Sequence, residues 1–196
     1  MTFAVGAIVL AAGESTRMGT QKALLEWEGV PLIAYELDQL AQVPAVRETI
    51  VVTGHEPERV REIAERHRAT VVHNPAYASG KVTSILAGLH ALPDGIDAVM
   101  VLAVDQPRRA DVLRGIVDAH AAGGCVITAP VHGGRRGHPT LFSAVLLPEL
   151  LLIDEGSEGL RAVMRAHRDE VHEVECDASV HVDLNRPADI ARMRDP

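Results

Sequence analysis

The stretch Val5-Gly-Ala-Ile-Val-Leu-Ala-Ala-Gly-Glu-Ser-Thr-Arg-Met-Gly-Thr-Gln-Lys22 decides how the chain is expected to fold. It opens with an apolar run that is long enough for one strand and rich in Val and Ile. Such a run is typical of a strand buried on both faces in the middle of a parallel sheet. The run stops at a loop of small residues, and open α/β sheets bind their ligands at the carboxyl ends of such strands.

The loop itself predicts a site for a polyphosphate. Glycines let backbone N–H groups close around an anion, and Arg17 and Lys22 add two cations that neutralise it. The spacing differs from a Walker A loop, because five residues separate Gly13 from Gly19 and the lysine follows three positions later. The G-x-G-x-x-G dinucleotide pattern is absent as well. The residues alone therefore leave open an ordinary strand-to-helix connection with surface charges.

The segment from Leu10 to Lys22, Leu-Ala-Ala-Gly-x-Ser-x-Arg-Met-Gly-x-x-Lys, resembles the signature loop of the MobA-like nucleotidyltransferases. It is most similar to the molybdenum cofactor cytidylyltransferase branch, which typically has Ala-Ala-Gly where the guanylyltransferase branch has Ala-Gly-Gly. The resemblance recurs along nearly the whole chain. It implies a catalytic role for Arg17 and Lys22, and it implies that the nucleotide is bound by Leu10, Ala11, Ala12, Gly13, Ser15, Arg17, Met18, Gly19 and Lys22.

Composition indicates a single α/β domain over residues 1–196, because this length allows one sizeable core. The net charge of −8 argues against binding to nucleic acid or to an anionic membrane. No apolar run approaches the ~20 residues of a membrane span. Cys125 and Cys176 form no close pair and no metal-binding spacing, which predicts free thiols and a cytoplasmic location. Only two of the 19 basic residues are lysines, and both Lys22 and Lys81 fall in glycine-containing loops.

Residues 74–91 carry a second motif, Asn-Pro-x-Tyr-x-x-Gly-Lys-x-Thr-Ser, which begins with a turn signal. Taken alone, it predicts a loop and a helix capped by Ser79 or Thr83. The resemblance implies that part of it lies against the nucleotide, with Lys81 nearby. The residues that would make this contact are Asn74, Gly80, Thr83 and Ser84.

Residues 97–104 form the strongest predicted strand, and it ends at Asp105-Gln-Pro. A carboxylate at this position points into the same crevice as the glycine loop and suits Mg²⁺, which is held by one or two carboxylates plus substrate phosphates. A plain turn or N-cap role is the alternative. The resemblance implies that Asp105 is the metal ligand. The resemblance also covers the closing segment, residues 183–190, where it implies that Asn185 is the second metal ligand and that Asp183 is the alternative. In this segment Arg186 replaces the usual Thr.

The segment His132-Gly-Gly-Arg-Arg-Gly-His-Pro139 is a glycine-rich, cationic excursion between apolar runs, which favours a second anion site. The resemblance implies that it borders the pocket for molybdopterin. Ser157 stands where the family tends to have Asp, which puts an acid's role at that place in doubt. The residues assigned to the acceptor are Gln106, Arg136, Gly137, His138, Pro139 and Arg161.

Alternating strand and helix patterns predict a three-layer α/β/α sandwich with a mostly parallel sheet, and the resemblance implies a Rossmann-like nucleotidyltransferase fold. Periodicity does not decide whether residues 141–152 are strand or helix. The other expected strands are 49–53, 70–73, 124–129, 171–174 and 180–182, and the expected helices are 31–42, 57–68, 109–121 and one ending at 167.

The resemblance implies that the chain transfers CMP from CTP to the phosphate of molybdopterin or molybdenum cofactor, with Mg²⁺, and releases pyrophosphate. No protein nucleophile is needed, since the acceptor is already an oxyanion. Ala12 is a candidate filter, because its methyl group would crowd a purine more than a pyrimidine. The alternatives are a guanylyltransferase that uses GTP, a sugar-phosphate nucleotidyltransferase, and a non-catalytic carrier of the cofactor. A molybdenum hydroxylase or its chaperone is an expected partner.

Overall fold

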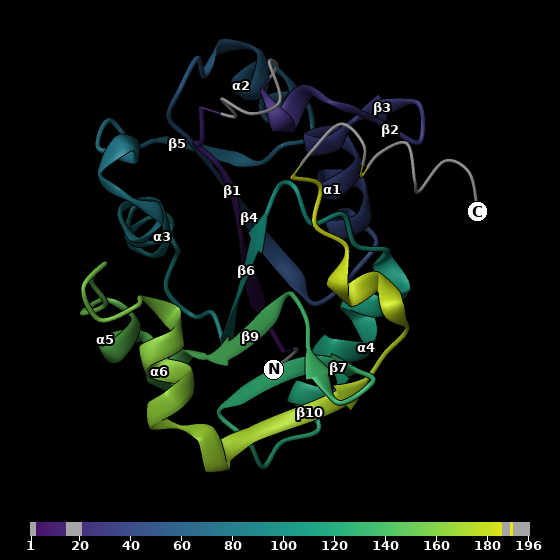
Figure 1. Cartoon of the computed structure of the whole chain (residues 1–196), viewed down its shortest axis with the longest axis vertical. Helices are drawn as coiled ribbons and strands as arrows, with labels where there is room; N and C mark the ends of the chain where they lie inside the picture. The colour runs from purple at the N-terminus through teal and green to yellow at the C-terminus, as the bar shows by residue number, and fades with distance from the viewer. Residues whose placement is uncertain (1–2, 15–20, 186–188, 190–196) are drawn as a thin grey trace.

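The computed structural model describes residues 3–14, 21–185 and 189 of the chain. Its central sheet has the strand order β10-β7-β9-β6-β1-β4-β5, with β8 paired to β7 (Figure 1). A separate two-stranded ribbon joins β2 to β3. The strands are β1 Val5–Ala11, β2 Glu26–Trp27, β3 Val30–Pro31, β4 Val46–Thr53, β5 Thr70–His73, β6 Ala98–Ala103, β7 Ile127–His132, β8 Arg135–Arg136, β9 Thr140–Ser143 and β10 Val171–Glu175.

Strand β1 lies at the centre of the sheet and is buried along its whole length. It runs parallel to both neighbours, with Ile8 opposite Ile50 of β4 and Val101 of β6. Only β8 and β9 run antiparallel to their neighbours in this sheet, so the expected mostly parallel sheet is confirmed. The chain leaves β1 for β4 on one side and later returns to β6 on the other. This reversal creates the kind of crevice where open sheets bind ligands.

Helices cover both faces of the sheet and confirm the three-layer arrangement (Figure 1). Alternate residues of β1 face opposite ways, so Ala7 and Val9 pack in one apolar cluster while Ile8 and Leu10 pack in the other. The first cluster holds α1 Leu32–Ala41, α2 Glu58–Arg66 and α4 Ala110–Ala121; the second holds α3 Lys81–His90, α5 Leu147–Leu150 and α6 Leu160–Ala166.

Two local predictions need correction, and the structure decides a third region that the sequence left open. The strand expected at 180–182 is wrong, because residues Ala178–His181 form a short 3-10 helix that begins where Asp177 accepts a hydrogen bond from the Ser179 N–H. Neither Ser79 nor Thr83 caps α3. Its cap comes from a distant carboxylate, described below. The undecided region 141–152 contains both forms, since β9 ends at Ser143 and α5 follows after one 3-10 turn.

Candidate active site

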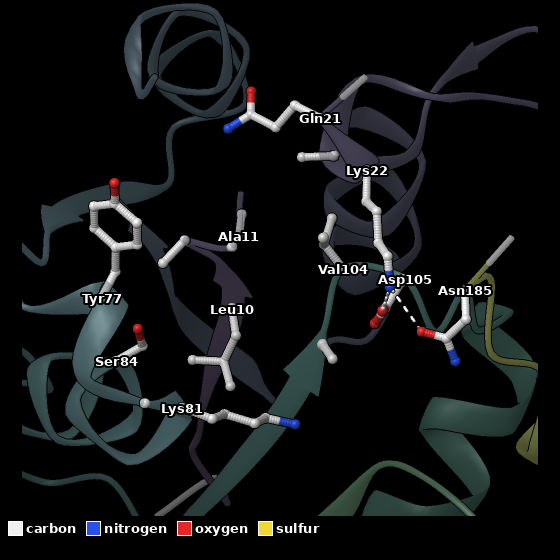
Figure 2. A pocket seen from close by; sticks show the side chains of 15 residues that line it. Leu10, Ala11, Gln21, Lys22, Tyr77, Lys81, Ser84, Val104, Asp105 and Asn185 are labelled. Atoms are coloured by element: carbon white, nitrogen blue, oxygen red, sulfur yellow. Dashed lines mark hydrogen bonds and ion pairs between the residues drawn. The ribbon is translucent and has the colours of Figure 1, made fainter. Parts of the chain in front are cut away.

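A cavity of about 490 Å³ opens at the carboxyl ends of β1 and β6 (Figure 2). Its walls come from the end of β1, the segment after the glycine loop, the start of α3 and the segment after β6. This is the crevice that the strand order predicts. The described residues that line it are Leu10, Ala11, Ala12, Gly13, Gln21, Lys22, Ala23, Tyr77, Gly80, Lys81, Ser84, Ala103, Val104, Asp105 and Asn185.

Lys22 joins two groups that are far apart in the sequence. Its Nζ donates a hydrogen bond of 2.6 Å to Asp105 Oδ2 and one of 2.8 Å to Asn185 Oδ1 (Figure 2). The Leu184 N–H donates to the Asp105 carbonyl oxygen at 2.8 Å, which fixes the C-terminal segment against the end of β6. The two oxygens therefore converge on one cationic nitrogen in the cavity.

This donor set fits a divalent metal ion. The Asp105 and Asn185 side chains supply hard oxygens that already face one positive charge, and Mg²⁺ or Mn²⁺ prefers such ligands. Among the described residues, no three His, Cys, Asp or Glu side chains gather in a metal-binding group. A metal here would complete its coordination with substrate phosphates and water. Of the two residues expected to act with Asp105, Asn185 lines the cavity and bonds Lys22, whereas Asp183 does not line it.

The structure brings most of the residues predicted to bind the nucleotide to this cavity. Leu10, Ala11, Ala12 and Gly13 line it at the end of β1, and Gly80 and Ser84 line it from α3. The Asn74 amide holds the start of α3 by donating hydrogen bonds of 2.9 Å to the hydroxyls of Thr83 and Ser84. Neither Asn74 nor Thr83 itself lines the cavity. The predicted residues Ser15, Arg17, Met18 and Gly19 lie outside the described residues.

The sequence analysis did not assign Gln21, Ala23, Tyr77, Ala103 or Val104 to the cavity, and of these Gln21 and Tyr77 bring a polar and an aromatic side chain. The Gln21 amide donates to the carbonyl oxygen of His55 at 2.8 Å, which ties the segment after the loop to the end of β4. The Tyr77 ring stands at the other side of the cavity (Figure 2). It contacts the ring of His55. Tyr77 lies in a segment whose sequence predicts a turn, so the sequence alone does not mark its ring as part of a binding site.

The N-terminus of α3 is capped by Glu155, whose Oε1 accepts a hydrogen bond of 2.6 Å from the Val82 N–H. Negative charge at this end of a helix is stabilising. Gly80 is required at this point, because its φ is +130° and a Cβ there would overlap the Glu155 carboxylate. The Glu155 carboxylate therefore occupies the place at the start of α3 where a bound anion would otherwise be stabilised.

A second cavity, of about 550 Å³, adjoins the first and shares Lys81 and Ala103 with it. In Figure 2 the Lys81 side chain extends from α3 toward the side of the cavity that holds Asp105. Consecutive residues face the two cavities, since Asp105 lines the first and Gln106 the second. The second is lined by Lys81, Val101, Ala103, Gln106, Arg136, Gly137, His138, Thr140, Phe142, Leu160, Arg161, Met164, Arg165 and Arg168.

The second cavity is cationic on one part of its wall and apolar on another. Four arginines and Lys81 line it, and none of its described lining residues is acidic. Burial and the positive charges of Lys81, Arg108 and Arg161 lower the pKa of His138, while Asp183 opposes them. Five of the six residues predicted for the acceptor line this cavity, and Pro139 is the exception. Arg165 and Arg168 were not predicted, because no motif marks them on α6 and the turn that follows.

The MobA-like NTP transferase domain family matches residues 7–171. The molybdenum cofactor cytidylyltransferase of Escherichia coli K12 is 28% identical over 194 residues, which cover 98% of this chain and 96% of that protein. The nicotine blue oxidoreductase of Paenarthrobacter nicotinovorans is also 28% identical, over 96% of both. The solved manganese complex of Rv0371C from Mycobacterium tuberculosis H37Rv is 25% identical, with a TM-score of 0.79 and 97% of each chain covered. No helix within the described ranges has the length and apolarity needed to cross a membrane.

Proposed function

The chain belongs to the MobA-like NTP transferase family, and from this premise we propose that it transfers CMP from CTP to the phosphate of molybdopterin or molybdenum cofactor. The E. coli relative named for this reaction supports the choice, since the match covers almost the full length of both proteins. The relative named as an oxidoreductase is as similar in identity, so the proposal depends on the site.

The observation that carries the proposal is the pair of adjoining cavities. One is built around the oxygens of Asp105 and Asn185 and the end of β1 up to Gly13, as a triphosphate site requires. The other presents cations and apolar groups, and it meets the first at Lys81 and Ala103. A reaction that joins two separately bound phosphate compounds needs this arrangement, because most of its rate comes from holding the reactants in line.

The reaction that fits moves a nucleotidyl group without a covalent enzyme intermediate. An oxygen of the acceptor phosphate bonds to the α-phosphorus of CTP, and the bond from that phosphorus to the α,β-bridging oxygen breaks. Pyrophosphate leaves with the electron pair. Lys22 and Lys81 supply positive charge where negative charge accumulates, which is the main form of catalysis in such transfers. Asp105 and Asn185 would hold a divalent cation, which when bound adds further charge neutralisation at the phosphates.

The second cavity supports an acceptor that is both anionic and partly flat. Phe142, Leu160 and Met164 offer apolar contact for a ring system, and Gln106 offers an amide for hydrogen bonds. The surrounding arginines suit bidentate recognition of phosphate or another oxyanion. These are the features that a phosphorylated pterin requires.

The position of Ala12 supports CTP, and not GTP, as the nucleotide substrate. It lines the first cavity next to Gly13, and its carbonyl oxygen accepts a hydrogen bond from the His55 N–H at 3.1 Å, so the backbone there is fixed. A methyl group on a fixed backbone takes space that a purine would need. We therefore assign the preference for CTP to the space that the Ala12 methyl group occupies at the end of β1.

The test is pyrophosphate release with molybdenum cofactor, or in parallel a sugar phosphate, as acceptor, with CTP, GTP, ATP and UTP compared in Mg²⁺ beside D105A. Binding of the cofactor to the protein is measured alongside. We expect release with CTP alone, and we expect it to be lost in the variant. Release with GTP would keep the reaction and overturn the assignment of Ala12. Release only with a sugar phosphate as acceptor would overturn the assignment of the second cavity. Tight binding of the cofactor without release from any nucleotide would contradict the enzyme and favour a carrier.

A further inference from the structure

Arg108 lies three residues after Asp105, and its side chain is only 1% exposed. A buried guanidinium is costly unless its donors are satisfied. Here four hydrogen bonds satisfy them, all to backbone carbonyl oxygens: from Nε to His138 at 2.7 Å, from Nη1 to Pro107 at 2.8 Å and Val182 at 3.1 Å, and from Nη2 to Val180 at 2.9 Å. One side chain thus binds three separate segments.

Each of these segments carries a part of the proposed site. Pro107 follows Asp105 and Gln106; His138 belongs to the acceptor cavity; and Val180 and Val182 precede Asn185. Backbone bonds close the same junction, since the His138 N–H donates to the Val180 carbonyl oxygen at 3.0 Å. Gly137 is close-packed there, because a Cβ on it would lie 2.5 Å from that oxygen. The acceptor loop and the segment around Val180 are therefore in close contact at this junction.

The donors of Arg108, and not an ion pair, explain why an arginine stands at this place. Among the described residues no carboxylate forms a salt bridge with Arg108, although the carboxyl groups of Glu36, Asp183 and Asp105 act on it electrostatically. Burial lowers the pKa of Arg108 to about 10, so it keeps its charge at neutral pH. An apolar residue of similar volume would leave these four carbonyl oxygens without their donors, and each buried acceptor left unsatisfied is destabilising. What an apolar residue lacks is the fork of donors that links carbonyl groups from three loops.

We propose that Arg108 is a positioning residue that holds the metal-ligand pair Asp105 and Asn185 in register with the acceptor loop around His138. The inference rests on the proposed function, because it assigns Arg108 the task of aligning the two halves of that site. Groups that orient metal ligands from behind are worth about 10–100-fold in metal affinity or activity.

Lysine is the sharpest replacement. R108K keeps the charge but places a single nitrogen where three nitrogens now reach four carbonyl groups, so the segments lose their common link. The matched control is R109K, because Arg109 is the next residue and pairs with Asp111 and Asp177 at the exposed surface. Both variants make the same exchange at neighbouring positions. Arg109 is exposed and reaches Asp177 at the surface, whereas Arg108 is buried and also reaches the acceptor loop at His138.

The experiment measures Mn²⁺ affinity by titration calorimetry without substrates, and kcat and KM for CTP and for the acceptor. For R108K we expect Mn²⁺ affinity to fall about 10–100-fold and kcat to fall similarly, with R109K like the wild type. Wild-type Mn²⁺ affinity and kcat in a folded R108K, with only a lower melting temperature, would overturn the proposal. An inactive wild type would instead count against the proposed function, and the Mn²⁺ titration would still test Arg108.

A second measurement needs no variant and covers the case in which R108K does not fold. Hydrogen exchange of the wild-type protein reports the opening of the His138 and Leu184 amides, which donate across the junction. If Arg108 holds the segments as one unit, the two amides open with the same free energy. Separate opening of residues 178–185, with the acceptor loop still protected, would contradict the proposal.

Discussion

Lys22 is the residue on which the proposed chemistry depends most directly. Its ammonium group lies between Asp105 and Asn185, with about a fifth of the side chain exposed, so it can respond when phosphates and a metal enter the cavity. An extended side chain with a single charged nitrogen suits such a role better than a planar guanidinium. The position of this one atom connects the glycine loop to the end of β6 and to the C-terminal segment.

Replacement of Lys22 tests that role. K22M keeps the length and volume of the side chain and removes its charge, so we expect kcat for pyrophosphate release to fall roughly 10²–10³-fold, as for loss of one group that stabilises transition-state charge. The matched control is R59M, since Arg59 is an exposed cation of α2. A decrease of less than threefold in K22M would remove Lys22 from the catalytic groups.

At the scale of elements, the close contact between α3 and β1 sets the position of the cavity wall. Gly88 of α3 lies against β1, and a Cβ added there would stand 2.4 Å from Ile8 Cγ2 in the core. Gly115 of α4 is also a helical glycine, yet a Cβ on it would meet no atom within 4 Å. The first glycine is needed for packing, and the second is not.

These two glycines form a matched pair for a stability measurement. G88A overfills a close-packed contact and is expected to lower the free energy of unfolding by about 1–3 kcal/mol. G115A only removes backbone freedom within a helix and is expected to raise it by up to about 1 kcal/mol. Urea denaturation at neutral pH measures both values. Equal effects of the same sign would contradict the contact between α3 and β1.

His120 makes the attachment of α4 sensitive to pH. Its side chain is 4% exposed and hydrogen-bonded to the Thr128 hydroxyl, and burial together with His172 lowers its pKa below the usual 6.5. Below pH 6.5 the unfolded chain binds a proton there that the folded protein resists, so stability is lost as pH falls. We expect H120Q to lose less unfolding free energy than the wild type between pH 7.5 and 5.5. Parallel losses in both proteins would exclude this explanation.

The elements that sequence predicts well are those with strong apolar patterns. The buried runs at β1 and β6, the helices around them and strand β5 follow from local periodicity. The prediction fails at 180–182, where the sequence also looks like a strand. Val180 is buried there, but its carbonyl oxygen is bound by Arg108 and His138, so the backbone partners are a side chain and a loop and not a neighbouring strand.

At the scale of the whole molecule, the candidate site joins residues that local patterns cannot relate. The bond between Lys22 and Asn185 spans 163 positions, and nothing in the sequence predicts it. The resemblance to a family implied only that both residues belong to the site. A single sequence does not distinguish four further residues from surface or core residues, because no motif marks them: Glu155, Arg108, Arg165 and Arg168. The structure adds the relation between the two cavities, which meet where Asp105 and Gln106 face opposite sides.

The measurement that tests the central proposal most directly follows the phosphorus atoms of CTP. The protein is incubated with molybdenum cofactor and CTP labelled at the α-phosphate, and in parallel with CTP labelled at the γ-phosphate. Nucleotidyl transfer predicts that the α label appears in the acceptor and the γ label in pyrophosphate, and that N185A slows both. Appearance of the γ label in the acceptor, or of the α label only in free CMP or CDP, would contradict the account.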